Sequence, residues 1–136
     1  MRWAVALLAL ATVAGCGTDG GVRVEGTAPA SPKHPVYAVV YMGDALQRPA
    51  AFALSEFSSA SKVRWTSWGG ETATGTGEVS GMWCIPGCES KGYPATITLS
   101  KIHWLERSGY YSRISVSSTH KLGEDLTDQP LEVPPR

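Results

Sequence analysis

The sequence predicts an all-β domain over residues 36–119, folded as a small antiparallel β-sandwich or open barrel of six to seven strands. Three observations support this fold class. Several short segments alternate apolar and polar residues with a period of two. Turn signals rich in glycine and proline separate these segments at hairpin spacing. No window of helical length places apolar residues at a period of 3.6.

A signal peptide is predicted over residues 1–15, ahead of the domain. Arg2 supplies a positive charge, and residues 4–13 form an apolar run of ten residues. This is the length expected of the hydrophobic region of a signal peptide. A membrane-spanning helix needs roughly 20 apolar residues, so the run is too short to be one.

Residues 13–16 (VAGC) resemble the lipobox of bacterial lipoprotein signal peptides. The resemblance implies cleavage before Cys16 and attachment of a diacylglyceryl group to its thiol. A lipidated Cys16 would anchor the protein at the outer face of the bacterial cytoplasmic membrane. The alternative is ordinary secretion with cleavage after Ala14, which would leave Cys16 as an unmodified thiol.

Residues 16–35 are predicted to be the lipidated N-terminus and a flexible stalk. The segment is rich in glycine and proline, and Val22 and Val24 are its only bulky aliphatic residues. It cannot bury enough apolar surface to offset the entropy lost on ordering. As a flexible coil it would span about 25 Å root-mean-square, which would lift the domain off a bilayer.

The strand candidates follow in order along residues 36–42, 49–57, 63–68, 71–83, 95–99 and 110–117. In the third of these, alternation puts Trp65 and Trp68 on opposite faces. In the last, it puts Tyr110 on the face of Ile114 and Tyr111 on the other. The apolar phase also changes after Leu99, which indicates a bulge near residues 100–101 or a strand that leaves the core.

Cys84 and Cys88 are predicted to form a disulfide. They flank Pro86-Gly87, a strong turn signal that would bring the two sulfur atoms together. A structural zinc site is less favoured because it needs four ligands, and the three histidines are isolated in the sequence. The spacing also differs from the C-x-x-C pair of thiol oxidoreductases.

Residues 120–136 are predicted to be an extended C-terminal tail, either lying along the domain or frayed.

The composition of the chain restricts the classes of partner that the protein could bind. The chain has 12 basic and 12 acidic residues, without a basic patch, so nucleic-acid binding has no electrostatic support. No cofactor or metal is indicated.

Residues 48–88 resemble a pattern found in small secreted or lipid-anchored proteins of actinobacteria. The matching segments are 48–50 (RPA), 63–70 (VRWTSWGG) and 73–77 (ATGTG), together with Cys84 and Cys88. The resemblance implies a β-domain associated with the cell wall and a short disulfide loop. It carries over no catalytic residue.

Trp65, Trp68 and Trp83 are the candidate ligand platform. An outward indole beside glycines can bind the apolar face of a sugar ring or a proline-rich peptide, and its N–H can donate a hydrogen bond. The alternative is that these tryptophans fill the core.

The sequence therefore predicts a non-catalytic binding or scaffolding domain at the cell surface, with a cell-wall glycan or a protein as ligand. One alternative is a secreted-protease inhibitor that presents the Cys84–Cys88 loop as a rigid surface. A less favoured alternative is a hydrolase acting in the cell wall. No serine lies in a G-x-S-x-G elbow, and nothing singles out a carboxylate pair among Glu71, Glu78, Glu89 and Glu106.

Overall fold

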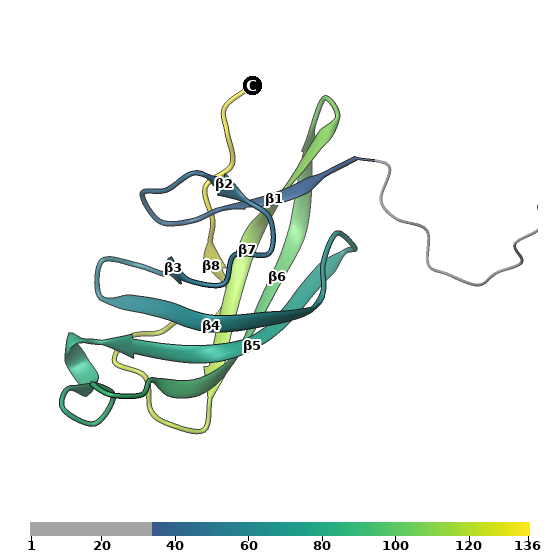
Figure 1. Cartoon of the computed structure of the whole chain (residues 1–136). Coiled ribbons are helices and arrows are strands. Elements are labelled where there is room, and N and C mark those ends of the chain that lie inside the picture. The colour runs from purple at the N-terminus through teal and green to yellow at the C-terminus, as the bar shows by residue number, and fades with distance from the viewer. Residues whose placement is uncertain (1–33) are drawn as a thin grey trace, which may run out of the picture. The chain divides into compact units, whose positions relative to one another are not determined.

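A computed structural model describes residues 34–136 of the chain (Figure 1). The predicted signal peptide, Cys16 with its predicted lipid, and residues 17–33 of the predicted stalk lie outside the described residues. Among residues 34–136, no helix is long and apolar enough to cross a bilayer.

Strands make up most of the described chain. Their bounds are β1 (Val36–Val39), β2 (Ala45–Leu46), β3 (Phe52–Ala53), β4 (Ser58–Ser67), β5 (Thr72–Gly81), β6 (Tyr93–Leu105), β7 (Ser108–Ser118) and β8 (Gln129–Pro130). A short 3-10 helix, η2 (Met82–Cys84), follows β5. The predicted strand over residues 49–57 is reduced to the two residues of β3, and β4 starts five residues before the predicted strand at 63–68.

The strands form one mixed sheet in the order β2-β1-β7-β6-β5-β4-β3, and β8 pairs with β7 outside this path. The sheet curls into a half barrel (Figure 1). The all-β fold class is thus confirmed, with the open barrel rather than the sandwich as its form.

One strand pair corrects the prediction of a purely antiparallel sheet. β1 runs parallel to β7, with Val36 opposite Gly109 and Tyr37 opposite Tyr110. Parallel neighbours need a long connection, and here the chain between them builds the rest of the sheet before it returns as β7. Such a pairing between distant segments leaves no local signal in the sequence.

The connections between the strands define two ends of the sheet. The turns β4–β5 (68–71) and β6–β7 (106–107) lie at one end, and Pro35 joins them there because its carbonyl accepts a hydrogen bond from the Gly109 N–H at 2.9 Å. We call this the hairpin end. The connections 40–44, 54–57, 82–92 and 119–128 lie at the other end, which we call the loop end (Figure 1).

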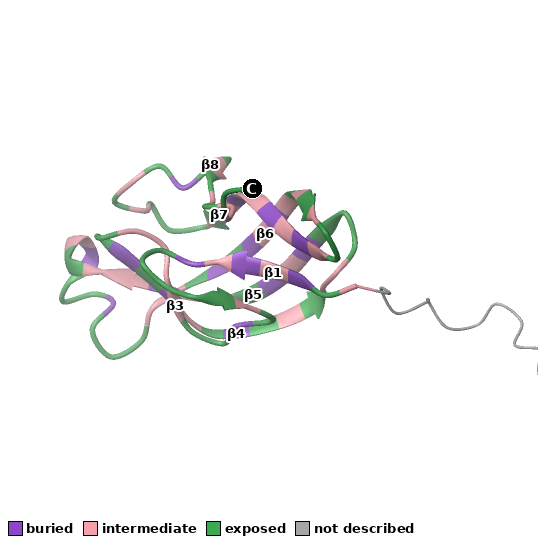
Figure 2. Ribbon diagram, turned by 90° about the horizontal axis from the view of Figure 1, so that it is seen from above, coloured by how far each residue is buried: buried purple, intermediate pink, exposed green. Residues whose placement is uncertain are grey.

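The core lies on the inner face of the curled sheet, where buried residues alternate along the strands (Figure 2). Over residues 95–99 of β6 the alternation is strict, with Ala95, Ile97 and Leu99 buried. The remaining buried members of the core are Val36, Ala38, Ala60, Val63, Ala73, Val79, Tyr111, Ile114, Val116 and Leu126.

The predicted opposite orientation of Trp65 and Trp68 is wrong. Their rings meet edge to face with centroids 4.8 Å apart. The register between β4 and β5 shifts between Trp65 and Ser67, and such an irregularity re-aims the following side chain. Simple alternation therefore fails at this point of β4.

The predicted phase change near residues 100–101 is present, but it inserts no residue between β6 and β7. Ser100 still faces Arg113, and Ile102 still faces Tyr111. Lys101 instead adopts a φ of 57° and points its side chain to solvent. As a result Tyr111 is fully buried, so the prediction that Tyr110 shares the face of Ile114 is wrong.

The C-terminal tail packs along the domain. Leu126 belongs to the core, and its carbonyl accepts a hydrogen bond from the Val116 N–H at 2.8 Å. β8 then pairs with β7 at Arg113 and Ile114. Of the two arrangements that the sequence left open, the structure has the packed one.

Candidate functional site

The Cys84–Cys88 disulfide organises the loop end. The two sulfur atoms are bonded, as predicted, and the Cα atoms lie 5.5 Å apart. Inside the loop, the Cys88 N–H donates to the Cys84 carbonyl and the Glu89 N–H donates to the Pro86 carbonyl, both at 3.0 Å. Both cysteines are buried, so the bridge supports the loop from beneath.

Trp83 fastens this loop to the start of β4. Its indole N–H donates to the Ser58 hydroxyl at 3.0 Å, and Ser58 is only 2% exposed. The Ser58 hydroxyl in turn donates to the Glu124 carboxylate, which also accepts a hydrogen bond from Ser55 at 2.7 Å. Three connections of the loop end are therefore held together by one hydrogen-bond network.

Three large apolar side chains stand exposed above this network. Phe57, Met82 and Ile85 are 60%, 83% and 51% exposed, respectively. They line one open hollow of about 370 Å³ together with Glu56 and Glu89. We call Phe57, Met82 and Ile85 the apolar tip.

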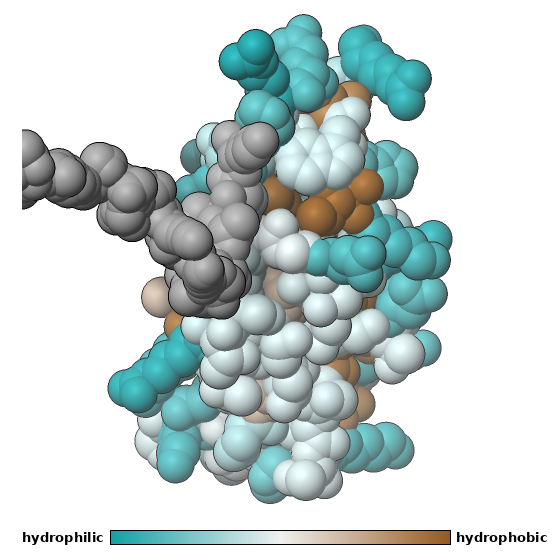
Figure 3. Space-filling view, turned by 90° about the vertical axis from the view of Figure 1, so that its right-hand side faces the viewer, coloured by the Kyte–Doolittle hydropathy of each residue, from teal (hydrophilic) through white to brown (hydrophobic). Residues whose placement is uncertain are grey.

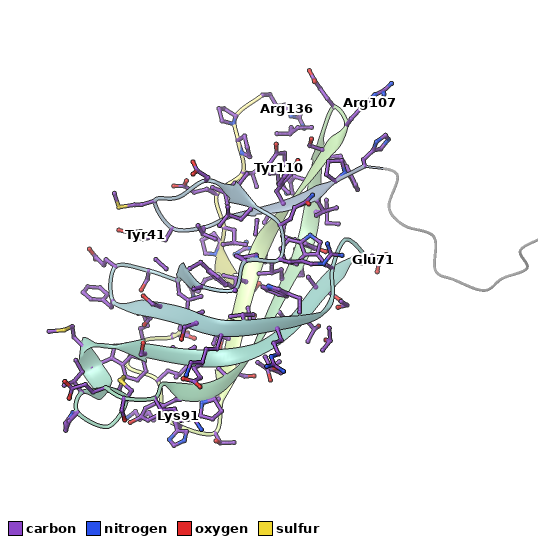
Figure 4. All side chains as sticks on the ribbon, in the orientation of Figure 1. Tyr41, Glu71, Lys91, Arg107, Tyr110 and Arg136 are labelled. Atoms are coloured by element: carbon purple, nitrogen blue, oxygen red, sulfur yellow. A yellow bond between two sulfur atoms is a disulfide. The ribbon has the colours of Figure 1, made fainter. Side chains whose placement is uncertain are left out.

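A fourth connection adds two more apolar side chains to the same end. Tyr41 and Met42, in the turn after β1, are also exposed, and Tyr41 projects on the side of the β3–β4 turn (Figure 4). Among the residues that the structure describes, these five and Trp104 are the exposed large hydrophobic residues. Five of the six thus lie at the loop end.

Two acidic side chains, Glu56 and Glu89, line the apolar hollow itself. The loop-end connections carry more carboxylates than lysines: Asp44, Glu56, Glu89, Glu124, Asp125 and Asp128 against Lys91 and Lys121. Lys91 lies by the disulfide loop (Figure 4). The loop end therefore combines an exposed apolar tip with a surplus of carboxylates.

The predicted tryptophan platform is not assembled. Trp65, Trp68 and Trp83 all pack against the core, and Trp83 lies at the opposite end of the β4–β5 hairpin from Trp68. Each indole N–H is engaged: Trp65 donates to the Pro49 carbonyl at 2.9 Å and Trp68 to the Val36 carbonyl at 2.8 Å. These contacts match the alternative interpretation, in which the three tryptophans are packing residues.

The carboxylates weighed for glycoside cleavage do not meet in one place. Glu78 accepts a hydrogen bond from the Gly92 N–H at 2.9 Å and lies 3.7 Å from the Lys62 ammonium group. Glu71 and Glu106 lie at the hairpin end, whereas Glu89 lies at the loop end. Within residues 34–136 there is also no cluster of three side chains that could hold a metal ion.

Comparison with known proteins adds no relative. No family model matches the chain, and neither does any curated protein or solved structure.

The site as a whole suits binding. Exposed apolar patches on small domains mark interaction surfaces, and large side chains in a rigid frame carry most of the energy of a protein interface. The sequence singled out the disulfide loop, which contains Ile85. It missed Phe57 and Met82, because their exposure depends on how β4 and η2 end.

Proposed function

We propose that this protein is a lipid-anchored, non-catalytic binding module that presents its apolar tip to another protein at the outer face of the bacterial cytoplasmic membrane. The observation that carries the proposal is the gathering of five exposed hydrophobic side chains in three loops at one end of the sheet. The loops that carry Phe57, Met82 and Ile85 are fixed by a disulfide and by the Trp83–Ser58–Glu124 network. A fixed surface loses less conformational entropy when it binds.

The tip lies at the end of the domain opposite the point where the chain enters it. The domain is entered at Pro35, at the hairpin end, and the loop end lies at the other end of the sheet. A lipid on Cys16, joined through the stalk, would therefore tether the domain from its hairpin end and leave the tip at the untethered end. The surplus of carboxylates at the loop end also opposes contact with anionic lipids, because like charges repel.

The chemistry of the partner follows from the tip. It should offer an apolar side chain for the hollow between Phe57, Met82 and Ile85, with lysine or arginine around it to face Glu56 and Glu89. A secreted protease is one form of such a partner, since Ile85 is half-exposed in a disulfide-closed loop.

The binding proposal is tested by site-specific photo-crosslinking of the full-length protein in bacteria. A crosslinker at Ile85 should give one discrete protein adduct, and the double variant Phe57→Ser/Met82→Ser should remove it. The same crosslinker at the exposed Lys62 is the matched control. Equal adducts from both positions, or none from Ile85, would contradict the proposal. If the adduct is a protease, inhibition assays then decide whether binding blocks it.

The anchor needs a separate test. Mass spectrometry of the mature protein should find an acylated N-terminal Cys16, and Cys16→Ser should move the protein from the membrane fraction to the medium. An unmodified Cys16 in a membrane-free protein would overturn the anchor without touching the binding proposal.

A further inference from the structure

The last part of β6 has a neighbouring strand on one side only. β5 pairs with β6 as far as Thr72 opposite Ser100, whereas β7 stays beside β6 as far as Ser108 opposite Leu105. Within residues 34–136, no strand pairs with residues 102–105 on the side where the pairing with β5 has stopped. These four residues therefore form a free sheet edge at the hairpin end, and we call it the β6 edge.

The hydrogen bonds of the hairpin show which backbone groups the β6 edge presents. The Gly109 N–H donates to the Pro35 carbonyl at 2.9 Å, on the side of β7 that faces β1, so it points away from β6. Gly109 lies opposite Trp104. Two residues opposed in an antiparallel pair direct their backbone groups either both toward each other or both away. The N–H and C=O groups of Trp104, and those of Ile102 two residues earlier, therefore point to the free side.

The side chains of the β6 edge lack the usual protection of an exposed strand. Native edges carry charged residues or proline, or a loop covers them, whereas residues 102–105 read Ile-His-Trp-Leu. A Cβ atom on Gly109 would lie 2.8 Å from Cγ2 of Ile102 and 2.9 Å from Cζ3 of Trp104, so both side chains lie on one face. Trp104 is 50% exposed there. Both residues line an open hollow of about 470 Å³ where the pairing with β5 stops.

Charged side chains flank the β6 edge at both of its ends. Glu71 and Lys101 lie where the pairing with β5 stops, and Glu106 and Arg107 form the β6–β7 turn. All four are exposed, and none forms an ion pair with another residue of the described part of the chain. Figure 3 shows hydrophilic side chains at the top of the domain, directly above pale and hydrophobic ones. Each end of the edge thus carries one carboxylate and one cation.

This arrangement of charges is self-complementary. When two such edges pair antiparallel, the start of one lies beside the end of the other. Glu71 and Lys101 of one copy then meet Arg107 and Glu106 of the other, so each cation finds a carboxylate. A two-fold axis makes both contacts at once, which is the symmetry of most protein dimers.

We propose that the β6 edge pairs antiparallel with the β6 edge of a second copy of this chain, with Trp104 opposite Trp104 of that copy. Residues whose backbone groups point outward must face each other, so within the edge Trp104 can face only its counterpart or Ile102. If it faced Ile102, Glu106 of the second copy would fall opposite Ser100, a place that Thr72 occupies. The register with the two indoles opposed avoids this overlap. The proposal does not depend on the apolar tip, which lies at the other end of the sheet.

Disulfide crosslinking of the full-length protein in bacteria tests this register. His103 should lie opposite Leu105 of the second copy, with the Cα atoms about 4.5 Å apart, a separation that a disulfide can span. The double variant His103→Cys/Leu105→Cys should therefore give a covalent dimer on non-reducing electrophoresis. Each single variant should give about tenfold less, because neither position faces its own counterpart.

Substitutions at the interface should change the yield of this dimer. Adding Trp104→Arg to the double-cysteine variant should remove the dimer, because two guanidinium groups would then meet across the axis. Adding Arg107→Glu instead should lower the yield, and the further change Glu71→Arg should restore it. The circular dichroism of all variants should agree with that of the parent protein.

The matched control is a cysteine pair of the same spacing in the same strand. Thr96→Cys/Thr98→Cys should give no dimer, because β5 covers that part of β6. Equal dimer yields from the two cysteine pairs, or no dimer from the β6 edge, would overturn the proposal. So would a dimer that persists in a folded Trp104→Arg variant. A covalent adduct with a different protein would show that another chain fills the edge, and it would equally overturn pairing between two copies.

Discussion

The indole of Trp83 lies directly on the backbone of Gly123, so that a Cβ atom on Gly123 would overlap the ring. The two residues come from connections that are distant in the sequence, the disulfide loop and the segment after β7. Their contact lies beside the hydrogen bonds that join Trp83, Ser58 and Glu124. The ring of Trp83 therefore holds two segments together, the loop that carries Met82 and Ile85 and the tail segment around Gly123.

Replacing Gly123 with alanine tests this contact. Gly123→Ala should lower the free energy of unfolding by about 1–3 kcal/mol, because the new methyl group has no room beside the indole. Urea titration followed by tryptophan fluorescence measures the change. Gly70→Ala is the matched control, since a Cβ there would lie 3.9 Å from its nearest neighbour, the Thr72 carbonyl oxygen. Equal stabilities of the two variants would mean that the indole does not rest on Gly123.

The sequence predicts those features of the fold that depend on near neighbours. The alternation of Ala95, Ile97 and Leu99 in β6, and the bridge across Pro86-Gly87, follow from local periodicity and turn chemistry. The sequence does not predict the parallel pairing of β1 with β7, because it depends on the path of some 70 intervening residues. It also fails at Trp68 and Tyr111, where a register shift and the left-handed Lys101 change the phase.

In the candidate sites, too, the sequence predicts the features that depend on near neighbours and misses those that depend on distant segments. The sequence predicts the loop containing Ile85, because cysteine spacing and a turn signal are local properties. The sequence predicts a platform of Trp65, Trp68 and Trp83, yet among the tryptophans of residues 34–136 the exposed indole belongs to Trp104. Burial of an indole depends on which strands and loops cover it, and sequence neighbours do not report that.

Removing the hydroxyl of Tyr111 should weaken the β4–β5 turn. This hydroxyl accepts a hydrogen bond from the Gly69 N–H at 2.9 Å and donates one to the Gly70 carbonyl at 2.8 Å. Tyr111→Phe leaves both groups without this partner, so we expect a loss of about 1–3 kcal/mol in the free energy of unfolding. Tyr110→Phe, next in the chain, should change it by less than about 0.5 kcal/mol. A similar loss in both variants would contradict the assignment.

The same tyrosine should make stability depend on alkaline pH. Burial raises the pKa of Tyr111 above its ordinary value of 10.0, although the Gly69 N–H and Arg48 act in the opposite direction. Below pH 10 the phenol is protonated in both folded and unfolded protein, and its contribution is fully present. Above pH 10 the unfolded chain loses this proton first, so stability falls as pH rises. The urea midpoint should fall less steeply from pH 8 to 11 in Tyr111→Phe than in the parent protein. If the two proteins gave parallel curves of midpoint against pH, Tyr111 would not be the cause of the alkaline loss of stability.

Reducing the Cys84–Cys88 bridge should loosen the loop end more than the sheet. The bridge closes a short loop, which in the chain-entropy model is worth about 2 kcal/mol. Urea unfolding with and without a thiol reductant measures that difference. Hydrogen exchange should accelerate at residues 82–92 and remain slow in β6 and β7. As a control, the stability of the double variant Cys84→Ala/Cys88→Ala should not change when the reductant is added. If reduction unfolded the protein completely, the whole fold and not only the loop end would depend on the bridge.

Truncating Leu126 tests whether the C-terminal tail belongs to the core. Leu126 is 6% exposed, and its carbonyl accepts a hydrogen bond from the Val116 N–H in β7. Its side chain therefore covers part of the inner face of the sheet and keeps solvent away from it. Leu126→Ala would remove buried methyl groups and leave a cavity, which should cost about 2–5 kcal/mol of stability. Lys121→Ala, at an exposed position of the same segment, should change it by less than about 0.5 kcal/mol. Because the tail also carries Glu124, the alanine at 126 should increase hydrogen exchange at Ser58 and Trp83. A tail that merely lies on the surface would give equal, small effects for both variants and no change at those two residues.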